Sequence, residues 1–146
     1  MTQAERRIYL ITALLKEQPQ FSKIEIPCDE QKQKTLLRSL LNIRMPRPVT
    51  EEFLTVQNAY LQEETRRKGI TVLSDLVPVQ EEIYLWCGDI TTLKCDAIVN
   101  AANSQMLGCF CPNHGCIDNA IHTFAGVQLR LTCADLMKQQ CHEEET

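Results

Sequence analysis

The spacing of apolar residues changes near residue 83, and this change constrains the fold more than any other feature of the chain. Up to about residue 77, leucine, isoleucine and aromatic residues recur at helical spacing. From residue 83, short unbroken apolar runs (83–87 and 97–99) are instead typical of strands buried on both faces of an α/β sheet. Helical spacing returns over residues 118–137. We therefore predict a helical extension over residues 1–77 and an α/β unit over residues 78–146.

Residues that commonly cap helices predict three helices in the extension. Thr2 followed by Glu5 fits a capping box. Asp29 and Thr50 are suitable N-terminal caps for a second and a third helix. The third helix ends in a basic turn (66–68) before a glycine, which suits the negative end of a helix dipole. The extension shows no catalytic constellation.

Charge and hydropathy argue against two classes of protein. The net charge of −4 argues against a general nucleic-acid-binding protein, because such proteins usually have a basic face. No apolar run approaches the ~20 residues that span a bilayer, and the N-terminus lacks the pattern of a secretory signal. We expect a cytoplasmic protein with no nucleic-acid or membrane partner. A small anionic ligand stays compatible with this charge, because backbone amides can hold phosphate.

Three of the eight cysteines lie beside a histidine in the polar loop before residue 118. Without signs of secretion, clustered cysteines indicate metal binding or catalysis more often than disulfides. Cys109, His114 and Cys116 can wrap one Zn²⁺ and leave a position open, as catalytic zinc sites do. Cys111 competes for one place, and its binding as a fourth ligand would close the site as a structural one. Free thiols or a redox pair are the alternative. The dispersed cysteines are expected to be buried apolar residues or surface thiols: Cys28, Cys87, Cys95, Cys133 and Cys141.

Two short polar segments follow the predicted strands. In residues 88–91, Asp89 can accept a hydrogen bond from a ligand amino group or simply cap the next turn. In residues 100–103, small residues between two asparagines let a ligand approach the backbone, although this is also a common turn composition. His122 lies one helical turn after Asp118, as a functional partner or as a packing residue.

Taken in order, these segments resemble the macrodomain family. The family pattern is a G-D-I-T turn, an A-I-V-N-A-A-N strand end and a glycine-rich loop leading into V-D-x-A-I-H. This chain has Gly-Asp-Ile-Thr at 88–91, Ala-Ile-Val-Asn-Ala-Ala-Asn at 97–103 and Ile-Asp-Asn-Ala-Ile-His at 117–122. A Cys-His-Cys insertion replaces the usual glycines after Gly108, which resembles the zinc-containing branch of ADP-ribosyl hydrolases with a helical extension. The resemblance covers roughly residues 83–137 and implies an α/β three-layer sandwich.

The resemblance implies a role for each matching residue. Asp89 would accept a hydrogen bond from the adenine amino group, with the backbone of Ile90 nearby. Asn103 would hold the distal ribose next to the bond that breaks. The loop at Gly108 would cradle the diphosphate with backbone amides. Asp118 would orient or activate the attacking water.

The implied activity is removal of mono-ADP-ribose from protein side chains, with Cys109, His114 and Cys116 holding zinc beside the distal ribose. Hydrolysis at the anomeric carbon passes through an oxocarbenium-like state, so the enzyme must stabilise positive charge and deliver water. Zinc would lower the pKa of its water towards ~7, orient the ribose hydroxyls, or merely stiffen the loop. The alternatives are a module that binds ADP-ribose without cleaving it and a zinc-stapled interaction module.

The macrodomain pattern is expected to be incomplete at the C-terminus. A βαβ unit takes roughly 30 residues, so residues 83–146 hold about two such units. Nothing after Cys133 matches the second ligand loop of the family, and the charged tail (139–146) has no strand signal. We therefore expect an N-terminal fragment that is marginally folded and weakly active or inactive.

Overall fold

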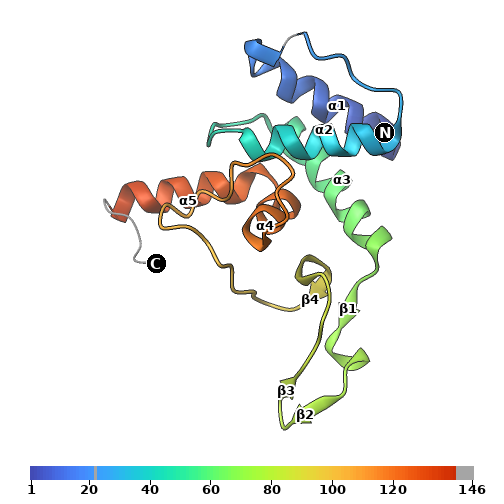
Figure 1. Ribbon diagram of the computed structural model, residues 1–146, viewed down its shortest axis with the longest axis vertical. Coiled ribbons are helices and arrows are strands. Elements are labelled where there is room, and N and C mark those ends of the chain that lie inside the picture. The colour runs from blue at the N-terminus through green and yellow to red at the C-terminus, as the bar shows by residue number, and fades with distance from the viewer. Residues whose placement is uncertain (22, 141–146) are drawn as a thin grey trace.

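The computed structural model describes residues 1–21 and 23–140. The α-helices of these residues are α1 (Gln3–Lys16), α2 (Glu30–Ile43), α3 (Glu51–Lys68), α4 (Ile117–Ala125) and α5 (Val127–Gln140). The strands are β1 (Thr71–Val72), β2 (Pro78–Gln80), β3 (Ile83–Tyr84) and β4 (Leu93–Lys94), and short 3₁₀ turns are η1 (Pro19–Phe21), η2 (Leu73–Asp75) and η3 (Ile90–Thr92). The helices α1–α3 gather at one end of the molecule and the strands at the other, with α4 and α5 beside the helical end (Figure 1). Among the helices so described, none combines the length and the apolar character needed to cross a membrane.

The caps predicted for the first three helices are confirmed. Thr2 and Glu5 form a capping box at the start of α1. The side chain of Asp29 accepts a hydrogen bond from the backbone amide of Lys32, and the side chain of Thr50 accepts one from that of Phe53. Each contact satisfies an amide that the first turn of a helix leaves unpaired, so these helices begin where the local sequence supplies a cap.

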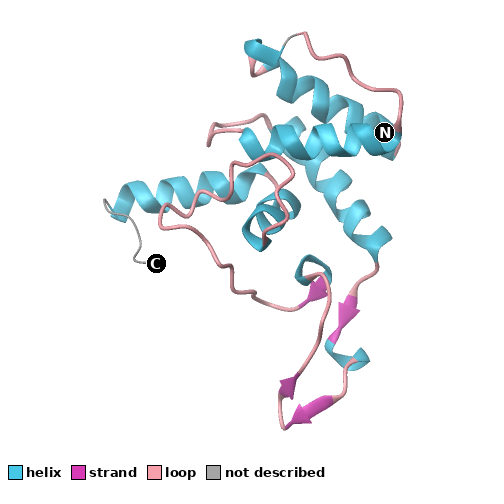
Figure 2. Cartoon of the chain, in the orientation of Figure 1, coloured by secondary structure: helices cyan, strands magenta, loops and turns pink. Residues whose placement is uncertain are grey.

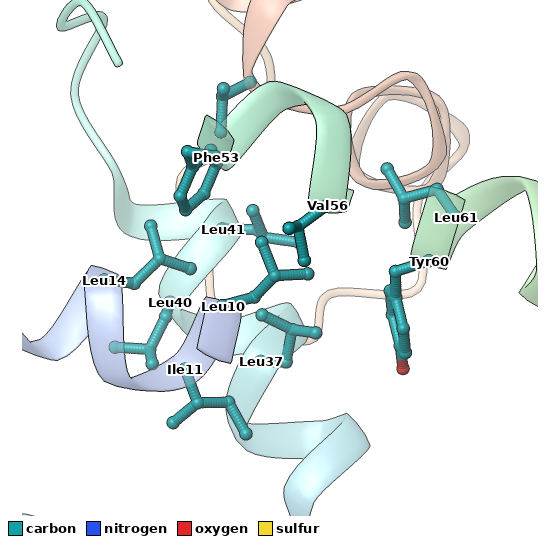
Figure 3. Close-up of a cluster of buried hydrophobic side chains, with 11 residues drawn as sticks. Leu10, Ile11, Leu14, Leu37, Leu40, Leu41, Phe53, Val56, Tyr60 and Leu61 are labelled. Atoms are coloured by element: carbon teal, nitrogen blue, oxygen red, sulfur yellow. The ribbon is translucent and has the colours of Figure 1, made fainter. Parts of the chain in front are cut away.

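One hydrophobic core joins α1, α2 and α3 and extends to the C-terminal helices. Figure 3 shows the apolar side chains of α1–α3 meeting in one cluster. Val127 of α5 belongs to the same cluster, and Phe124 of α4 packs against it. Burying each such side chain stabilises the fold by about 1.5–3 kcal/mol. The core members in α1–α3 are Leu10, Ile11, Leu14, Leu37, Leu40, Leu41, Phe53, Val56, Tyr60 and Leu61. This packing crosses the boundary predicted at residues 77 and 78, and the division into two domains stays a prediction.

Two buried polar side chains reinforce the same junction. The Gln57 side chain of α3 is fully buried, and its Oε1 accepts a hydrogen bond of 3.0 Å from the backbone amide of Val127. Arg130 of α5 donates from Nη1 to the carbonyl oxygens of Leu41 and Asn42 at the end of α2, at 3.2 and 2.9 Å. These carbonyls have no partner within their own helix, so Arg130 acts as a C-terminal cap for α2.

The predicted buried strands are wrong for the described residues. Of the run 83–87, only Ile83–Tyr84 is a strand, and it forms an exposed antiparallel hairpin with β2. The run 97–99 has no regular structure, and Val99 is 89% exposed. The remaining pair, β1 with β4, is parallel. A strand buried on both faces needs neighbouring strands and covering layers. In residues 1–21 and 23–140, each strand has one neighbour and no three-layer sandwich is seen.

The single helix predicted over residues 118–137 is instead two helices. Gly126 lies between α4 and α5 with a φ of +81°, and a side chain there would meet the Gln57 amide at 2.4 Å. Glycine adopts this left-handed conformation without a steric penalty and commonly ends a helix. The expectations for Cys141 and for the tail beyond residue 140 lie outside the described residues.

Candidate functional site

The loop from residue 95 to residue 116 connects β4 to α4 and carries most of the predicted site. It has no helix or strand, and it crosses the molecule from the strands to the helical end (Figure 2). Because no ladder of backbone hydrogen bonds fixes such a loop, its conformation depends on side-chain contacts and on glycine.

Cys109, His114 and Cys116 converge on one point. Their ligand atoms lie within 4.8 Å of one another, and Cys109 Sγ is 3.6 Å from His114 Nδ1. Tetrahedral zinc, with its usual bond lengths, places ligand atoms about 3.5–3.8 Å apart. The donor set and its spacing therefore fit Zn²⁺ with three protein ligands. Cys111 is exposed and lies outside this group.

The start of α4 links the metal ligands to the predicted catalytic carboxylate. Cys116 is the N-terminal cap of α4, and its Sγ accepts a hydrogen bond of 3.4 Å from the backbone amide of Asn119. Asp118 lies in the same helical turn and is 5% exposed. A thiol that can bind metal and a buried carboxylate are thus held by the same turn of backbone.

Asp118 is buried among polar groups. Its Oδ1 accepts a hydrogen bond of 2.7 Å from Asn100 Nδ2 and lies 3.6 Å from His122 Nε2. Burial lowers the pKa of His122 below its usual value; the carboxylate of Asp118 opposes this shift and Arg130 adds to it. Within the part of the chain that is described, Asn100 Oδ1 and His122 Nδ1 are buried without a hydrogen-bond partner. Such atoms usually bind water or a ligand.

Gly108 lies where the loop passes α4. Its φ is +80°, and a side chain there would come within 2.6 Å of the His122 imidazole. The Asn103 side chain donates a hydrogen bond of 3.2 Å to the Gly108 carbonyl. Asn103 and Gly108, both predicted to bind ligand, are therefore brought together beside the helix that carries Asp118.

Asp89 lies in a second group, at the end of α3. It caps η3: its Oδ1 accepts hydrogen bonds from the amide and the hydroxyl of Thr91, and its Oδ2 accepts one of 2.9 Å from Lys68 Nζ. Burial raises the pKa of Asp89, but the hydrogen bonds from Thr91 and Lys68 outweigh it and hold that pKa below its usual value. The Lys68 ammonium also lies 3.2 Å from the centre of the Phe124 ring. In this structure Asp89 therefore caps a turn.

Ile90 begins η3 and lines an open depression of about 370 Å³. The other walls come from the loop (95–98) and from Ile121 of α4. The depression lies between the turn that holds Asp89 and the helix that holds Asp118. Neither Asp89 nor Asp118 is among the residues that line it.

Sequence reasoning missed the residues that hold the loop from behind. Arg38 of α2 and Asn119 of α4 both contact it, and Arg130 donates a hydrogen bond of 2.6 Å to the Leu107 carbonyl. Asn119 lies within the segment 117–122, so its place in that motif was a usable signal. Arg38 is 76 residues from His114 in the chain, and nothing local marks it.

The family model of the Macro domain matches residues 99–146 of the chain. A protein from Treponema medium named "Protein-ADP-ribose hydrolase" is 59% identical over 150 residues, which cover 100% of this chain and 58% of that protein. A protein of the same name from Staphylococcus aureus (strain MRSA252) is 47% identical, over 93% of this chain and 51% of that protein. A "Probable bifunctional ADP-ribose hydrolase/ADP-ribosyltransferase" from Fusarium oxysporum f. sp. cubense is 42% identical over 75% of this chain and 20% of its own length. The chain thus spans little more than half the length of the two bacterial relatives.

Proposed function

We propose that this chain belongs to a zinc-containing macrodomain that hydrolyses the bond between mono-ADP-ribose and a protein side chain. The observation that carries the proposal is the joint position of two groups at the start of α4. Cys109, His114 and Cys116 form a potential metal site, and the buried Asp118 lies in the turn that Cys116 begins. Simple binding of ADP-ribose needs neither group. The match of residues 99–146 and the names of the bacterial relatives support the same activity.

Each part of the ligand is assigned to one part of the site. Asp89 and the Ile90 backbone bind adenine, for which Asp89 Oδ2 must share its hydrogen bonding with Lys68. The loop at Gly108 binds the diphosphate through backbone amides. Asn103 binds the distal ribose from its position against the Gly108 carbonyl.

Asp118 is the residue that carries out the chemical step. Asn100 holds one of its oxygens through a hydrogen bond, and His122 Nε2 lies 3.6 Å from the same oxygen. The carboxylate can therefore orient a water molecule and take its proton. The water attacks the anomeric carbon as the bond to the protein side chain breaks, and the side chain leaves with the electron pair of that bond. The proton taken by Asp118 then passes to the released side chain or to solvent, which regenerates the carboxylate. The oxocarbenium-like charge that develops there is stabilised by the nearby carboxylate. Zinc held by Cys109, His114 and Cys116 would supply Lewis acidity towards a water molecule or a ribose hydroxyl.

We infer that the whole protein forms the three-layer sandwich of macrodomains. In the described structure residues 97–99 are irregular, and Val99 is exposed. No strand pairing at residues 97–99 therefore supports the loop that carries Asn103. We therefore expect turnover by the 146-residue chain to be slow.

The proposal is tested by comparing binding with turnover in Asp118→Ala. The wild-type chain, loaded with zinc and in excess over mono-ADP-ribosylated protein, is expected to release ADP-ribose slowly. Asp118→Ala is expected to release it roughly 10²- to 10⁴-fold more slowly, because the general base is lost. Its affinity for free ADP-ribose, measured by calorimetry, should stay within error of the wild type.

Two further variants serve as controls. Asp118→Asn keeps a side chain of the same shape beside Asn100, so it separates loss of the base from a folding defect. Asp135→Ala removes an exposed carboxylate from α5 and should behave as wild type. Binding of ADP-ribose with no release above the Asp118→Ala rate would identify a reader module. Absence of binding would leave a zinc-stapled interaction module.

A further inference from the structure

Helix α2 of the N-terminal extension contacts the loop that carries the metal ligands. Arg38 Nη2 donates hydrogen bonds of 2.9 Å to the His114 carbonyl and 2.8 Å to Asn119 Oδ1. Arg38 Nε donates a second hydrogen bond, of 3.2 Å, to the same Asn119 oxygen. The planar guanidinium therefore joins the loop and the first turn of α4 in one fixed arrangement.

Asn119 passes this constraint on to the rest of the loop. Its side chain is fully buried, and its Nδ2 donates to the carbonyl of Cys111 at 3.0 Å and to that of Cys109 at 3.5 Å. Its backbone amide donates to Cys116 Sγ. The Arg38–Asn119 pair thus touches each residue of the metal group, two at their carbonyl oxygens and one at its ligand atom.

A second contact fixes the middle of the loop to the same helix. Asn42 of α2 is 1% exposed, and its Oδ1 accepts a hydrogen bond of 3.0 Å from the backbone amide of Asn113. The Asn113 side chain donates to Ser39 Oγ at 2.6 Å. Asn113 has a φ of +54°, a strained conformation for most residues that asparagine tolerates. The contacts to α2 therefore hold the loop in a shape that it would not favour alone.

We propose that Arg38 is a positioning residue of the metal centre. Through Asn119 and the His114 carbonyl it holds Cys109, His114 and Cys116 facing one point before the metal binds. The inference rests on the metal site of the proposed function and adds a role for the N-terminal extension. Without Arg38, the loop has to be ordered by the metal itself, and that ordering reduces the affinity.

The test measures metal binding rather than activity. The zinc dissociation constant of the full chain is measured by competition with a chelator of known affinity, and the geometry of the site by the visible spectrum of the Co²⁺-loaded chain. Arg38→Met is expected to weaken zinc binding roughly 10- to 100-fold, the range found for residues that support metal ligands. Its Co²⁺ spectrum is expected to change in band position or intensity. Arg38→Lys keeps a charge but not the planar fork. Its zinc affinity should therefore fall between that of the wild type and that of Arg38→Met.

Two controls separate positioning from general stability. Arg47→Met makes the same change at an exposed arginine beyond the end of α2 and should leave both readouts unchanged. Glu17→Gln weakens the ion pair with the buried Arg44, so it lowers stability without touching the loop. Thermal unfolding of each metal-free variant shows how much stability each substitution removes, for comparison with the change in zinc affinity. If Glu17→Gln lowers zinc affinity as much as Arg38→Met does, the effect is one of stability and the proposal is wrong.

The failure of this inference and that of the proposed function are distinguishable. A wild-type chain that binds no zinc removes the metal site, and both proposals fail. A wild-type chain that binds zinc, with Arg38→Met equal to it in affinity and Co²⁺ spectrum, overturns only the role of Arg38. If Arg38→Met does not fold, the decision passes to Arg38→Lys: an unchanged affinity and spectrum in that variant would overturn the proposal.

Discussion

Single residues differ in what they contribute to the metal site. Cys109 and Cys116 are half-buried and His114 is exposed, and the three meet although they come from different turns of one loop. Cys111 lies two residues from Cys109 but is exposed, and in the described structure it contributes its carbonyl to the contact with Asn119. Neighbouring cysteines therefore differ: the thiols of Cys109 and Cys116 lie in the candidate metal group, whereas that of Cys111 lies outside it.

This difference predicts the zinc content of single variants. The wild type, purified without added metal, should hold about one zinc per chain by elemental analysis, because an open zinc site takes three ligands from the protein. Cys109→Ser, His114→Ala and Cys116→Ser should each lose most of it. Cys111→Ser should keep it, as should Cys95→Ser, the control at an exposed cysteine elsewhere. Loss of zinc from Cys111→Ser would show that the site is closed by a fourth ligand.

Two glycines of the loop form a matched pair for testing its shape. At Gly108, φ is +80° and a methyl group would lie 2.6 Å from the His122 ring, whereas at Gly115 the space within 4 Å is empty. Gly108→Ala should lower the free energy of unfolding by at least about 1–2 kcal/mol, the cost of a left-handed conformation, and should weaken zinc binding. Gly115→Ala should change both little. Urea unfolding and the chelator competition check the pair, and equal effects would contradict the geometry described for Gly108.

The residues that bind could be predicted more readily than the residues that position them. Spacing predicts a metal group among Cys109, Cys111, His114 and Cys116, because a loop that wraps a metal carries its ligands close together in sequence. Arg38 lies 81 residues from Asn119, its partner, and its neighbours in sequence are typical of any helix. Contacts across such distances depend on packing, which no local pattern encodes.

At the scale of whole elements, the helices could be predicted from the sequence and the strands could not. Helix ends are decided by nearby caps such as Thr2, Asp29 and Thr50, so three helices began at the predicted residues. Strands depend on partners from elsewhere in the chain, and the run 97–99 has none in the described structure. Gly126 could have predicted the break between α4 and α5, because a glycine after a helical run commonly ends it.

The contact between α3 and α5 gives a prediction at this scale. Gln57 accepts the hydrogen bond of the first amide of α5, and its own Nε2 donates to Gln128 Oε1 at 2.7 Å. Gln57→Leu keeps the size of the side chain but leaves the buried Val127 amide without its acceptor. The free energy of unfolding in urea should fall by about 1–3 kcal/mol. Gln62→Leu, at an exposed position of α3, is the control, and an equal loss in both variants would contradict the role of Gln57.

At the scale of the whole molecule, the extension and the metal loop share one interior. Val127 lies in the core built by α1–α3, and Arg130 connects the end of α2 to the loop at Leu107. The sequence suggested two successive units because its periodicity changes near residue 83. Periodicity reports the kind of element, however, and not which elements pack together. The common interior therefore had to come from the structure.

The hydrogen bonds that Asn113 donates to Ser39 Oγ and Asn42 Oδ1 limit how the loop with the candidate metal ligands can be engineered. A protein engineer who grafts residues 108–118 onto a foreign scaffold transplants the ligands without the surface that shapes them. The donor sequence would be intact, but the graft would have to be ordered by zinc alone. A portable version of the proposed centre must carry α2 along with the loop, because the residues that shape the loop at Asn113 lie 71 and 74 positions earlier in the chain.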